Sequence, residues 1–481
     1  MPIRFLLGDE ERTLDGVSPT LTVLEYLRRH ERRTGTKEGC AEGDCGACTV
    51  VLSEPDGKGG LKHHAVNSCI QFVSTLHGRQ LTTVEDVAAP DGTLHPIQQA
   101  LVEKHGSQCG FCTPGFVMQL YAGWLEGTLT DRQAVKDWLA GNLCRCTGYG
   151  PIVDAGLEAG SGPRPDPAKA RATSIQLGKL TSGGMLSLRF GDQQVFAPRS
   201  ADELAEVYAA HPDAVLFAGA TDVGLRVTKQ HRHLKTLIDV TRVKDLSVIE
   251  EDEEGLTIGA TVSHRDATSA LAELHPDLGE LLRRFASIQI RNAGTVGGNI
   301  ANGSPIGDLP PALIALDARL TLRRGAERRE IPLEDFFIAY GKQDRAPGEF
   351  VESVYVPRLP AEARFACYKL AKRFDQDISA VMGAFMLRFE RGRIAEARIA
   401  YGGMAATPKR AAKAEAAVRG SAFDAATVEH AASALTADFA PITDMRASAH
   451  YRLLAAQNML RRFHLESAAD RPATRVLELA G

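Results

Sequence analysis

The segment Lys37-Glu38-Gly39-Cys40-Ala41-Glu42-Gly43-Asp44-Cys45-Gly46-Ala47-Cys48 decides the fold of the first part of the chain. It places three cysteines in a C-x4-C-x2-C spacing, and Cys69 follows as a fourth. This spacing is typical of the plant-type ferredoxin loop, in which four thiolates hold a 2Fe-2S cluster. The glycines between the cysteines allow the backbone to bring N–H groups close to sulfur. The pattern therefore favours an iron–sulfur site over a zinc site or disulfides.

A second set of four cysteines follows in two short motifs. Cys109 and Cys112 form a C-x2-C pair, and Cys144 and Cys146 form a C-x-C pair. Each pair lies beside the end of an expected helix, and loops at helix ends can converge on one point. The four thiols would then make a second four-ligand site. Ligand count alone is compatible with either a 2Fe-2S cluster or zinc.

The placement of the cysteines also bears on the cellular compartment. Eight of the nine fall within the first 146 residues, and the ninth is Cys367. The N-terminus has too short an apolar run for a secretory signal, and no later segment approaches membrane-spanning length. We therefore expect a cytoplasmic protein whose clustered cysteines bind metal rather than form disulfides. Cys367 has no thiol neighbour in the sequence and is expected to be a small buried hydrophobe.

Length and composition limit the architecture and the partners. A chain of 481 residues is too long for one compact core, so three or four domains are expected. The fractions of hydrophobic residues, 44%, and charged residues, 24%, are ordinary for a globular protein. The net charge of −4 gives no reason to expect nucleic acid or an anionic membrane as a partner.

The hydrophobic pattern divides the chain into regions. Residues 1–84 predict a β-rich module, with strands near 3–7 and 49–52. From residue 85 to 160 the period becomes helical, and caps or first-turn prolines predict four helices, beginning near Pro96, Thr113, Thr130 and Pro151. Residues 161–187 are rich in glycine and proline and are expected to be a linker.

The second half of the chain offers two glycine-bearing loops, at 217–224 and 292–299. Successive backbone N–H groups in such loops can bind phosphate. Neither loop matches G-x-G-x-x-G or the P-loop motif, so the residues alone leave a phosphate site and ordinary turns both open. From about residue 365 the pattern predicts a further α/β unit, with a strand near 394–401 and no recognisable catalytic constellation.

The order of these motifs resembles the iron–sulfur and FAD-bearing subunit of the molybdenum hydroxylase family, and within it the xanthine-oxidising members. The likeness rests on both cysteine sets together with segments 285–291 and 297–308, and it covers nearly the whole chain. It implies a 2Fe-2S cluster, not zinc, at the second site. The implied fold is multidomain α+β: a β-grasp ferredoxin-like 2Fe-2S domain (1–84), a four-helix 2Fe-2S domain (85–160), an α+β FAD-binding domain of PCMH type (188–362) and a C-terminal α/β flavoprotein domain (363–481).

The resemblance also implies site residues. The cluster ligands would be Cys40, Cys45, Cys48 and Cys69 for one 2Fe-2S cluster and Cys109, Cys112, Cys144 and Cys146 for the other. Residues 217–223 would hold the FAD pyrophosphate through backbone N–H groups, and Phe285 would pack near the flavin. The full set of implied FAD contacts is Phe217, Ala218, Gly219, Ala220, Thr221, Asp222, Val223, Phe285, Thr295, Gly298, Asn299, Asp308, Val351 and Lys369.

The implied activity is electron transfer during oxidation of hypoxanthine and xanthine to urate. Because nothing in the 481 residues is left for a molybdopterin-binding portion, that cofactor is expected on a large partner chain, in an assembly of two copies of each chain. Electrons would pass from molybdenum to the Cys109 cluster, then to the Cys40 cluster, FAD and NAD+. No catalytic residue is expected on this chain.

Three alternatives remain at this level. The partner could oxidise an aldehyde or another N-heterocycle, since substrate specificity would lie on that chain. The chain could instead be a stand-alone NADH:acceptor flavoprotein reductase, which would need no second subunit. A zinc-stapled interaction protein would be colourless and would contain neither iron nor flavin.

Overall fold

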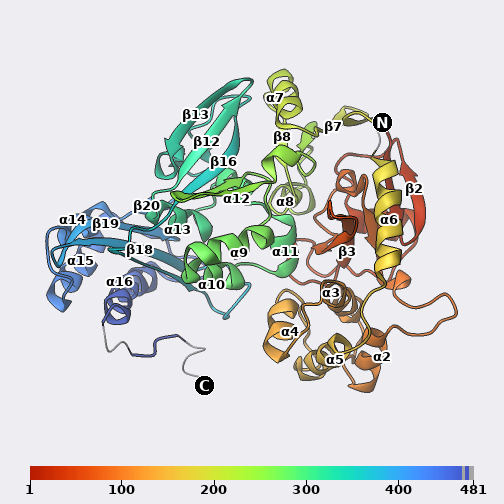
Figure 1. The fold of residues 1–481 in the computed structure, drawn as a ribbon, viewed down its shortest axis with the longest axis horizontal. Coiled ribbons are helices and arrows are strands. Elements are labelled where there is room, and N and C mark those ends of the chain that lie inside the picture. The colour runs from red at the N-terminus through yellow and green to blue at the C-terminus, as the bar shows by residue number, and fades with distance from the viewer. Residues whose placement is uncertain (182, 469–471, 476–481) are drawn as a thin grey trace. The chain divides into compact units, whose positions relative to one another are not determined.

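The computed structural model describes residues 1–181, 183–468 and 472–475, which divide into two compact units (Figure 1). Unit 1 comprises Met1–Lys244 and Ser287–Thr295, and unit 2 comprises Asp245–Ala286 and the chain from Val296 onward. The expected FAD-binding region, 188–362, therefore contributes to both units. Ser182 of the expected linker, and residues 469–471 and 476–481 of the expected C-terminal domain, lie outside the described residues.

Unit 1 begins with a five-stranded sheet in the order β2-β1-β5-β3-β4. β1 and β5 pair in parallel and the other neighbours are antiparallel. Thr22 caps a short helix by accepting a hydrogen bond from the Glu25 N–H at 3.1 Å, and this helix continues as a π-helical turn. The bounds are β1 (Ile3–Leu7), β2 (Glu10–Leu14), α1 (Val23–Glu25), the π-helical turn (Tyr26–His30), β3 (Thr49–Pro55), β4 (Leu61–Asn67) and β5 (Gln80–Thr82).

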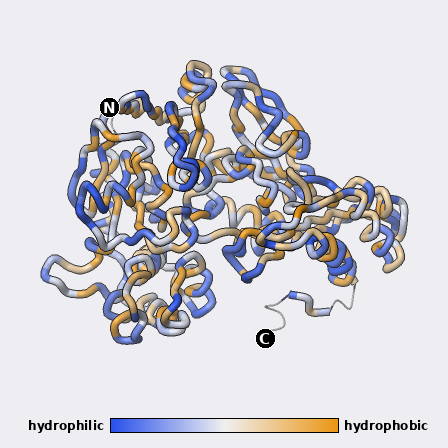
Figure 2. The backbone as a smooth tube through the Cα atoms, turned by 180° about the vertical axis from the view of Figure 1, so that it is seen from behind, coloured by the Kyte–Doolittle hydropathy of each residue, from blue (hydrophilic) through white to orange (hydrophobic). Residues whose placement is uncertain are grey.

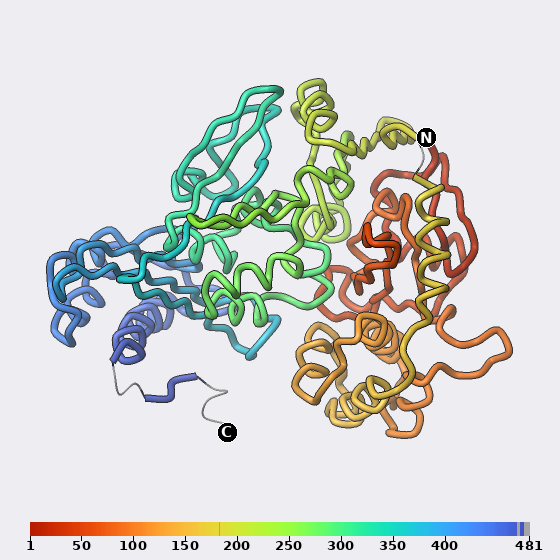
Figure 3. Tube along the Cα trace, viewed as in Figure 1, coloured from red at the N-terminus to blue at the C-terminus, as the bar shows by residue number. Residues whose placement is uncertain are grey.

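Four helices pack together in the next region, as the sequence pattern predicts (Figure 3). Their shared core includes Leu120, Val135 and Ile152. The cap of the third helix differs from the prediction: Asp131, not Thr130, caps it, because its carboxylate accepts from the N–H groups of Gln133 and Ala134, both at 2.9 Å. The bounds are α2 (Pro96–Glu103), α3 (Thr113–Glu126), α4 (Arg132–Leu139) and α5 (Gly150–Gly160).

The expected linker, residues 161–187, contains a helix, α6 (Pro167–Leu180). Asp166 caps it, and Thr173, Leu177 and Leu180 are buried at helical spacing. Leu177 and Leu180 pack with Leu6 of the five-stranded sheet, which α6 contacts (Figure 1). The expected linker therefore contains an ordered helix, because one apolar face is enough to dock a helix that is otherwise polar.

The rest of unit 1 is built on a four-stranded sheet in the order β6-β7-β9-β8. β6 is antiparallel to β7, whereas β7 and β8 both run parallel to β9. Helix α11 lies against β4 of the first sheet, so a segment from far along the sequence packs beside the first cysteine loop. The bounds are β6 (Leu186–Phe190), β7 (Gln193–Ala197), α7 (Ala201–Ala210), β8 (Val215–Phe217), α8 (Val223–Thr228), β9 (Thr236–Asp239) and α11 (Ile288–Ala293).

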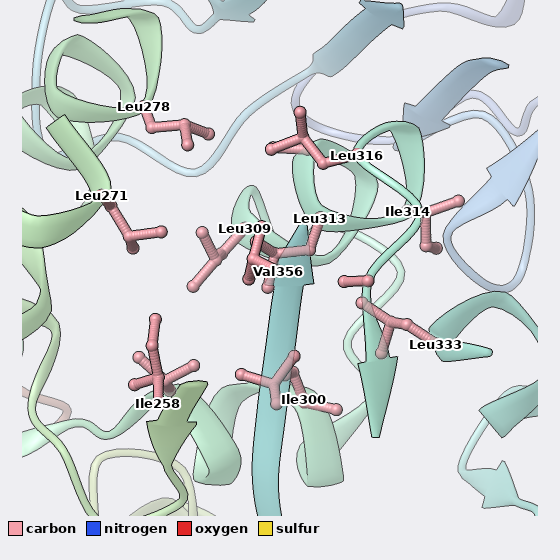
Figure 4. Close-up of a cluster of buried hydrophobic side chains, with 14 of the residues drawn as sticks. Ile258, Leu271, Leu278, Ile300, Leu309, Leu313, Ile314, Leu316, Leu333 and Val356 are labelled. Carbon is pink, nitrogen blue, oxygen red and sulfur yellow. The ribbon is translucent and has the colours of Figure 1, made fainter. Parts of the chain in front are cut away.

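Unit 2 opens with an antiparallel five-stranded sheet in the order β10-β11-β16-β12-β13 and a β14-β15 hairpin. Figure 4 shows its core, in which Ile258, Leu313 and Val356 come from different elements. The bounds are β10 (Ile249–Glu251), β11 (Gly255–Gly259), α9 (His264–Leu274), α10 (Pro276–Arg284), α12 (Val296–Asn302), α13 (Leu309–Ala315), β12 (Arg319–Arg324), β13 (Glu327–Pro332), β14 (Phe337–Ala339), β15 (Lys342–Gln343) and β16 (Phe350–Pro357).

The last part of unit 2 is an antiparallel sheet, β17-β18-β19-β20, with helices packed on it. The expected strand at 394–401 falls within β19, and the expected mixed α+β architecture is confirmed. Cys367 is buried in β17, as expected, and its thiol donates to the Asp277 carbonyl at 3.3 Å. The bounds are β17 (Ala363–Leu370), β18 (Val381–Glu390), β19 (Arg393–Gly402), β20 (Lys409–Arg410), α14 (Ala412–Val418), α15 (Ala425–Asp438) and α16 (Ala449–Glu466).

The hydropathy of the helices bears on whether any of them could cross a membrane. Figure 2 shows hydrophobic and hydrophilic residues interspersed along the backbone of the described chain. Among the described residues, no helix combines the length and the apolar character that crossing a lipid bilayer requires.

Burial of His77 in unit 1 predicts a pH effect on stability. Its Nδ1 accepts a hydrogen bond from the Arg4 N–H at 3.0 Å, and burial, with Arg242 and Arg4 nearby, lowers its pKa to about 4. The unfolded chain, with a His pKa of about 6.5, binds a proton in the range where the folded chain does not. The contribution of His77 to the free energy of unfolding should therefore be fully present above about pH 6.5. It should fall by up to ~3 kcal/mol as the pH drops to 4.

Chemical unfolding at pH 7 and pH 4.5 checks this expectation. The matched variant His77→Gln keeps an acceptor for the Arg4 N–H but has no titrating group, so its stability should fall less over the same interval. An equal fall in both proteins would contradict the assignment to His77.

Candidate functional site

The first four cysteines converge in unit 1. Three lie in the loop before β3, and Cys69 follows β4. Thiol contacts join them in the order Cys45, Cys40, Cys69, Cys48. Backbone N–H groups of Glu42, Asp44 and Cys45 surround the Cys40 sulfur, at 3.5, 3.4 and 3.4 Å. This arrangement of thiols with N–H donors around sulfur fits an iron–sulfur cluster.

The pKa values of these thiols show strong mutual influence. Hydrogen bonds with Cys45 and Cys69 hold the pKa of Cys40 far below its usual value, and the bond with Cys69 likewise lowers the pKa of Cys48. The same hydrogen bonds raise the pKa of Cys45 and of Cys69. The four thiols alone therefore cannot all ionise, whereas a bound cationic centre allows every coordinating thiol to lose its proton.

The second four cysteines lie around the start of α3 and the loop before α5. Cys112 contacts Cys144, and Cys109 contacts Cys146. Burial and the hydrogen bond with Cys144 raise the pKa of Cys112 to about 12. Burial alone would raise the pKa of Cys144, but hydrogen bonds from Thr147 and other groups lower it. The structure thus brings the four thiols of the second set together as two contacting pairs, and their role as cluster ligands remains a prediction.

The two sites differ in exposure. Cys109 and Cys146 are exposed, whereas Cys48 and Cys69 are each 2% exposed. The sites are also joined directly, because the Leu143 N–H, next to Cys144, donates to the Cys45 carbonyl at 3.0 Å.

Within the described part of the chain, no three Cys, His, Asp or Glu side chains are placed to hold a single metal ion.

The first glycine-bearing loop lies in unit 1, between β8 and α8. Gly219 is so close to the Ala293 carbonyl that a Cβ would overlap it, and the Gln71 side chain donates to the Gly219 carbonyl at 2.9 Å. The implied contacts in unit 1 are buried in part: Phe217, Gly219, Ala220 and Thr295 are buried, Ala218, Thr221 and Val223 are half-buried, and Asp222 is exposed. Gly219 of this loop therefore packs directly against Ala293.

The second glycine-bearing segment opens α12 in unit 2. The Gly297 N–H donates to the Ala260 carbonyl at 3.0 Å, Gly298 is exposed, and Asn299 is half-buried. The Asn299 Oδ1 atom is buried without a hydrogen-bond partner. A buried acceptor of this kind requires a donor, and the hydroxyl or amide groups of FAD can supply one. This atom fits the presence of the cofactor.

Four other implied FAD contacts, Asp308, Lys369, Phe285 and Val351, pack within unit 2. Lys369 Nζ donates to the Asp308 carboxylate at 2.6 Å and to the Ser379 hydroxyl at 2.8 Å, and Ser379 donates to Asp308 at 2.6 Å. Phe285 packs against the His264 ring, with centroids 4.8 Å apart. Val351 is buried in the core of β16. Their contact with FAD remains a prediction.

Two residues outside the sequence motifs, Gln71 and Ser379, make hydrogen bonds to the predicted FAD-binding residues. Gln71 follows Cys69 by two positions and holds the Gly219 carbonyl. Ser379 completes the buried group with Asp308 and Lys369. Neither residue lies in a motif with a characteristic spacing, so only the fold reveals their contacts.

Four family models match the chain in succession. They are the 2Fe-2S iron–sulfur cluster binding domain at residues 5–74, the [2Fe-2S] binding domain at 83–157, the FAD binding domain in molybdopterin dehydrogenase at 189–359 and the CO dehydrogenase flavoprotein C-terminal domain at 366–467. The chain therefore contains two 2Fe-2S-binding domains and an FAD-binding domain.

Curated relatives include xanthine dehydrogenases. That of Drosophila subobscura is 34% identical over 461 residues, which cover 84% of this chain and 34% of the relative. That of Emericella nidulans is 33% identical over 498 residues, covering 91% of this chain and 36% of the relative. The chain spans about a third of the length of these relatives.

Solved structures give the same relationship. A carbon monoxide dehydrogenase chain from Hydrogenophaga pseudoflava is 31% identical, with a TM-score of 0.53, over 58% of this chain and 96% of that chain. Quinoline 2-oxidoreductase from Pseudomonas putida 86 is 28% identical, with a TM-score of 0.53, over 58% of this chain and 98% of that chain. The chain belongs to the molybdenum hydroxylase family, as its iron–sulfur and FAD component.

Proposed function

We propose that this chain transfers electrons in a xanthine dehydrogenase, from a molybdenum cofactor on a partner chain to NAD+. The observation that carries the proposal is the direct junction of two four-cysteine sites in a chain that is 34% identical to a xanthine dehydrogenase. The substrate would be hypoxanthine or xanthine, and the product urate.

The proposed ligands divide by site. Cys40, Cys45, Cys48 and Cys69 would hold one 2Fe-2S cluster, and Cys109, Cys112, Cys144 and Cys146 the other. The residues proposed to hold FAD are residues 217–223, Phe285, Thr295, Gly298, Asn299, Asp308, Val351 and Lys369. When bound, the clusters supply one-electron carriers and FAD supplies the conversion between single electrons and hydride.

Exposure supports a direction for the electron flow. The exposed thiols of Cys109 and Cys146 suit the entry point, because a partner can approach them closely. The buried thiols of Cys48 and Cys69 suit an interior carrier, shielded from solvent. The hydrogen bond from Leu143 N–H to the Cys45 carbonyl supplies a short connection between the two sites.

The remaining parts of the proposal follow the resemblance. The partner is a large molybdopterin-binding chain, in an assembly of two copies of each, located in the cytoplasm. We propose the domain limits 1–84, 85–160, 188–362 and 363–481, with α6 inside the connecting segment. The similarity to carbon monoxide dehydrogenase and quinoline 2-oxidoreductase chains supports a second candidate, the same role with another small substrate.

Anaerobic addition of xanthine to the complex purified from its native host tests the proposal. Xanthine should bleach the iron–sulfur and flavin absorbance, and NAD+ should restore it. Bleaching by dithionite but not by xanthine would reject xanthine as the substrate and favour the second candidate. Bleaching by xanthine without recovery on NAD+ would reject NAD+ as the acceptor.

A further inference from the structure

A buried polar network touches the first cysteine loop at Gly46. The Gly46 carbonyl accepts three hydrogen bonds: from the Thr49 hydroxyl at 2.6 Å, the Thr49 N–H at 3.1 Å and the Asn142 side-chain amide at 3.1 Å. Thr49 and Asn142 are 1% and 3% exposed, so water does not compete for these bonds. One carbonyl between two proposed cluster ligands, Cys45 and Cys48, is therefore strongly polarised.

Gln289 sets the direction of these donors. Its Nε2 donates to the Asn142 Oδ1 at 2.7 Å, which fixes the Asn142 amide with its NH2 toward Gly46. It also donates to the Thr49 Oγ1 at 3.1 Å. Because the Thr49 oxygen accepts from Gln289, its single hydrogen is free to point to the Gly46 carbonyl. Gln289 is fully buried.

The polarised carbonyl shares a peptide group with a donor to sulfur. The Ala47 N–H belongs to the same peptide unit as the Gly46 carbonyl and lies beside the Cys45 thiol, where it favours the ionised sulfur. Bonds accepted by a peptide carbonyl strengthen the bond donated by its N–H. Hydrogen bonds to cluster sulfur stabilise the reduced, more negative state and so raise the reduction potential.

Gln289 packs closely against the backbone at Gly141. Gly141 has a φ of +125°, and a Cβ there would overlap the Gln289 Oε1 atom and the Ser287 side chain. The three side chains come from three regions of the sequence: Thr49 from the first cysteine region, Asn142 from the helical region and Gln289 from the segment 287–295. Docking of that segment therefore bears directly on the first cysteine loop.

We propose that Gln289 is a positioning residue that raises the reduction potential of the cluster at Cys40, Cys45, Cys48 and Cys69, by orienting Asn142 and Thr49 on the Gly46–Ala47 peptide. The inference rests on the proposed iron–sulfur function of these cysteines. Gln289 does not contact the cluster ligands, so its effect on the potential distinguishes a tuning role from simple packing.

An EPR-monitored redox titration of the full chain, with both clusters present, tests this inference. Thr49→Val removes the hydroxyl at nearly constant volume, and Gln289→Met removes the amide without touching the cysteine loop. At the wild-type midpoint potential, the ratio of reduced to oxidised cluster should fall about threefold to tenfold in both variants. A tenfold change corresponds to a decrease of about 59 mV in the midpoint potential for one electron. Thr49→Ser keeps the hydroxyl and should titrate as wild type.

The signal of the first cluster is identified by its loss in Cys45→Ser. If Cys45→Ser removes no signal, the proposed ligand set itself is wrong. If the signal is present but its midpoint is unchanged in Gln289→Met and Thr49→Val, the ligand set stands and the tuning role is rejected. An equal shift in Thr49→Ser and Thr49→Val would also reject it, because the hydroxyl would then have no part in the effect.

Discussion

The Cys109→Ser variant is expected to lose one of two iron–sulfur EPR signals and at least about 100-fold of its substrate-dependent NAD+ reduction. Substitutions behind the ligands of a metal site typically cost 10- to 100-fold in affinity or activity, so loss of a ligand should cost no less. Cys109 contacts Cys146 at the exposed site, where we propose that electrons enter. Serine keeps the size of the side chain but is a poor ligand for iron in place of a thiolate.

The matched control is Cys367→Ser, which changes the one cysteine outside both sites. It should retain both EPR signals, because the Cys367 thiol contacts only protein, at the Asp277 carbonyl. Measurement of EPR spectra and steady-state NAD+ reduction on the complex gives both readouts. Unchanged NAD+ reduction by Cys109→Ser, with its cluster absent, would contradict the proposed route.

The Gly219→Ala variant is expected to lose FAD while it keeps both clusters. A Cβ at this position would overlap the backbone of Ala293, so the loop at 217–223 must shift. Overpacking of this kind costs about 1–3 kcal/mol, which corresponds to roughly a 5-fold to 150-fold loss of FAD affinity if the shift falls on the binding loop. FAD content per chain, measured after extraction, and iron content of the same sample check the prediction.

Gly178→Ala provides the control for this substitution. Gly178 lies in α6, and a Cβ there meets no atom within 4 Å. Its FAD content should match that of the wild type, and alanine should slightly favour the helix. Equal FAD content in Gly219→Ala and Gly178→Ala would show that the loop does not bind the cofactor as proposed.

Local sequence patterns predict the four helices of the helical region, and the structure contains them. Caps and first-turn prolines act within one turn, so Pro96 and Pro114 locate their helices without knowledge of the fold. Asp131 rather than Thr130 caps α4. Both adjacent side chains can accept a hydrogen bond, and the residue at which the helical backbone begins determines which of them is the cap. Helix α6 was missed because its few apolar residues become informative only against the sheet that they cover.

Contacts between distant parts of the chain were beyond the reach of sequence patterns. Gln289 and Asn142 are 147 positions apart, and no periodicity links them. Asp308 and Lys369 were predicted as separate FAD contacts, but the fold places them in one buried ion pair with Ser379. Such pairs depend on which elements pack together, and local propensity does not determine that packing.

Quantification of iron, acid-labile sulfide, FAD and zinc in the purified chain tests the central claim most directly. Two 2Fe-2S clusters and one flavin predict about four iron atoms, about four sulfides and about one FAD per chain, without stoichiometric zinc. Zinc in place of iron, with no sulfide or flavin, would contradict the account and identify both cysteine sites as structural.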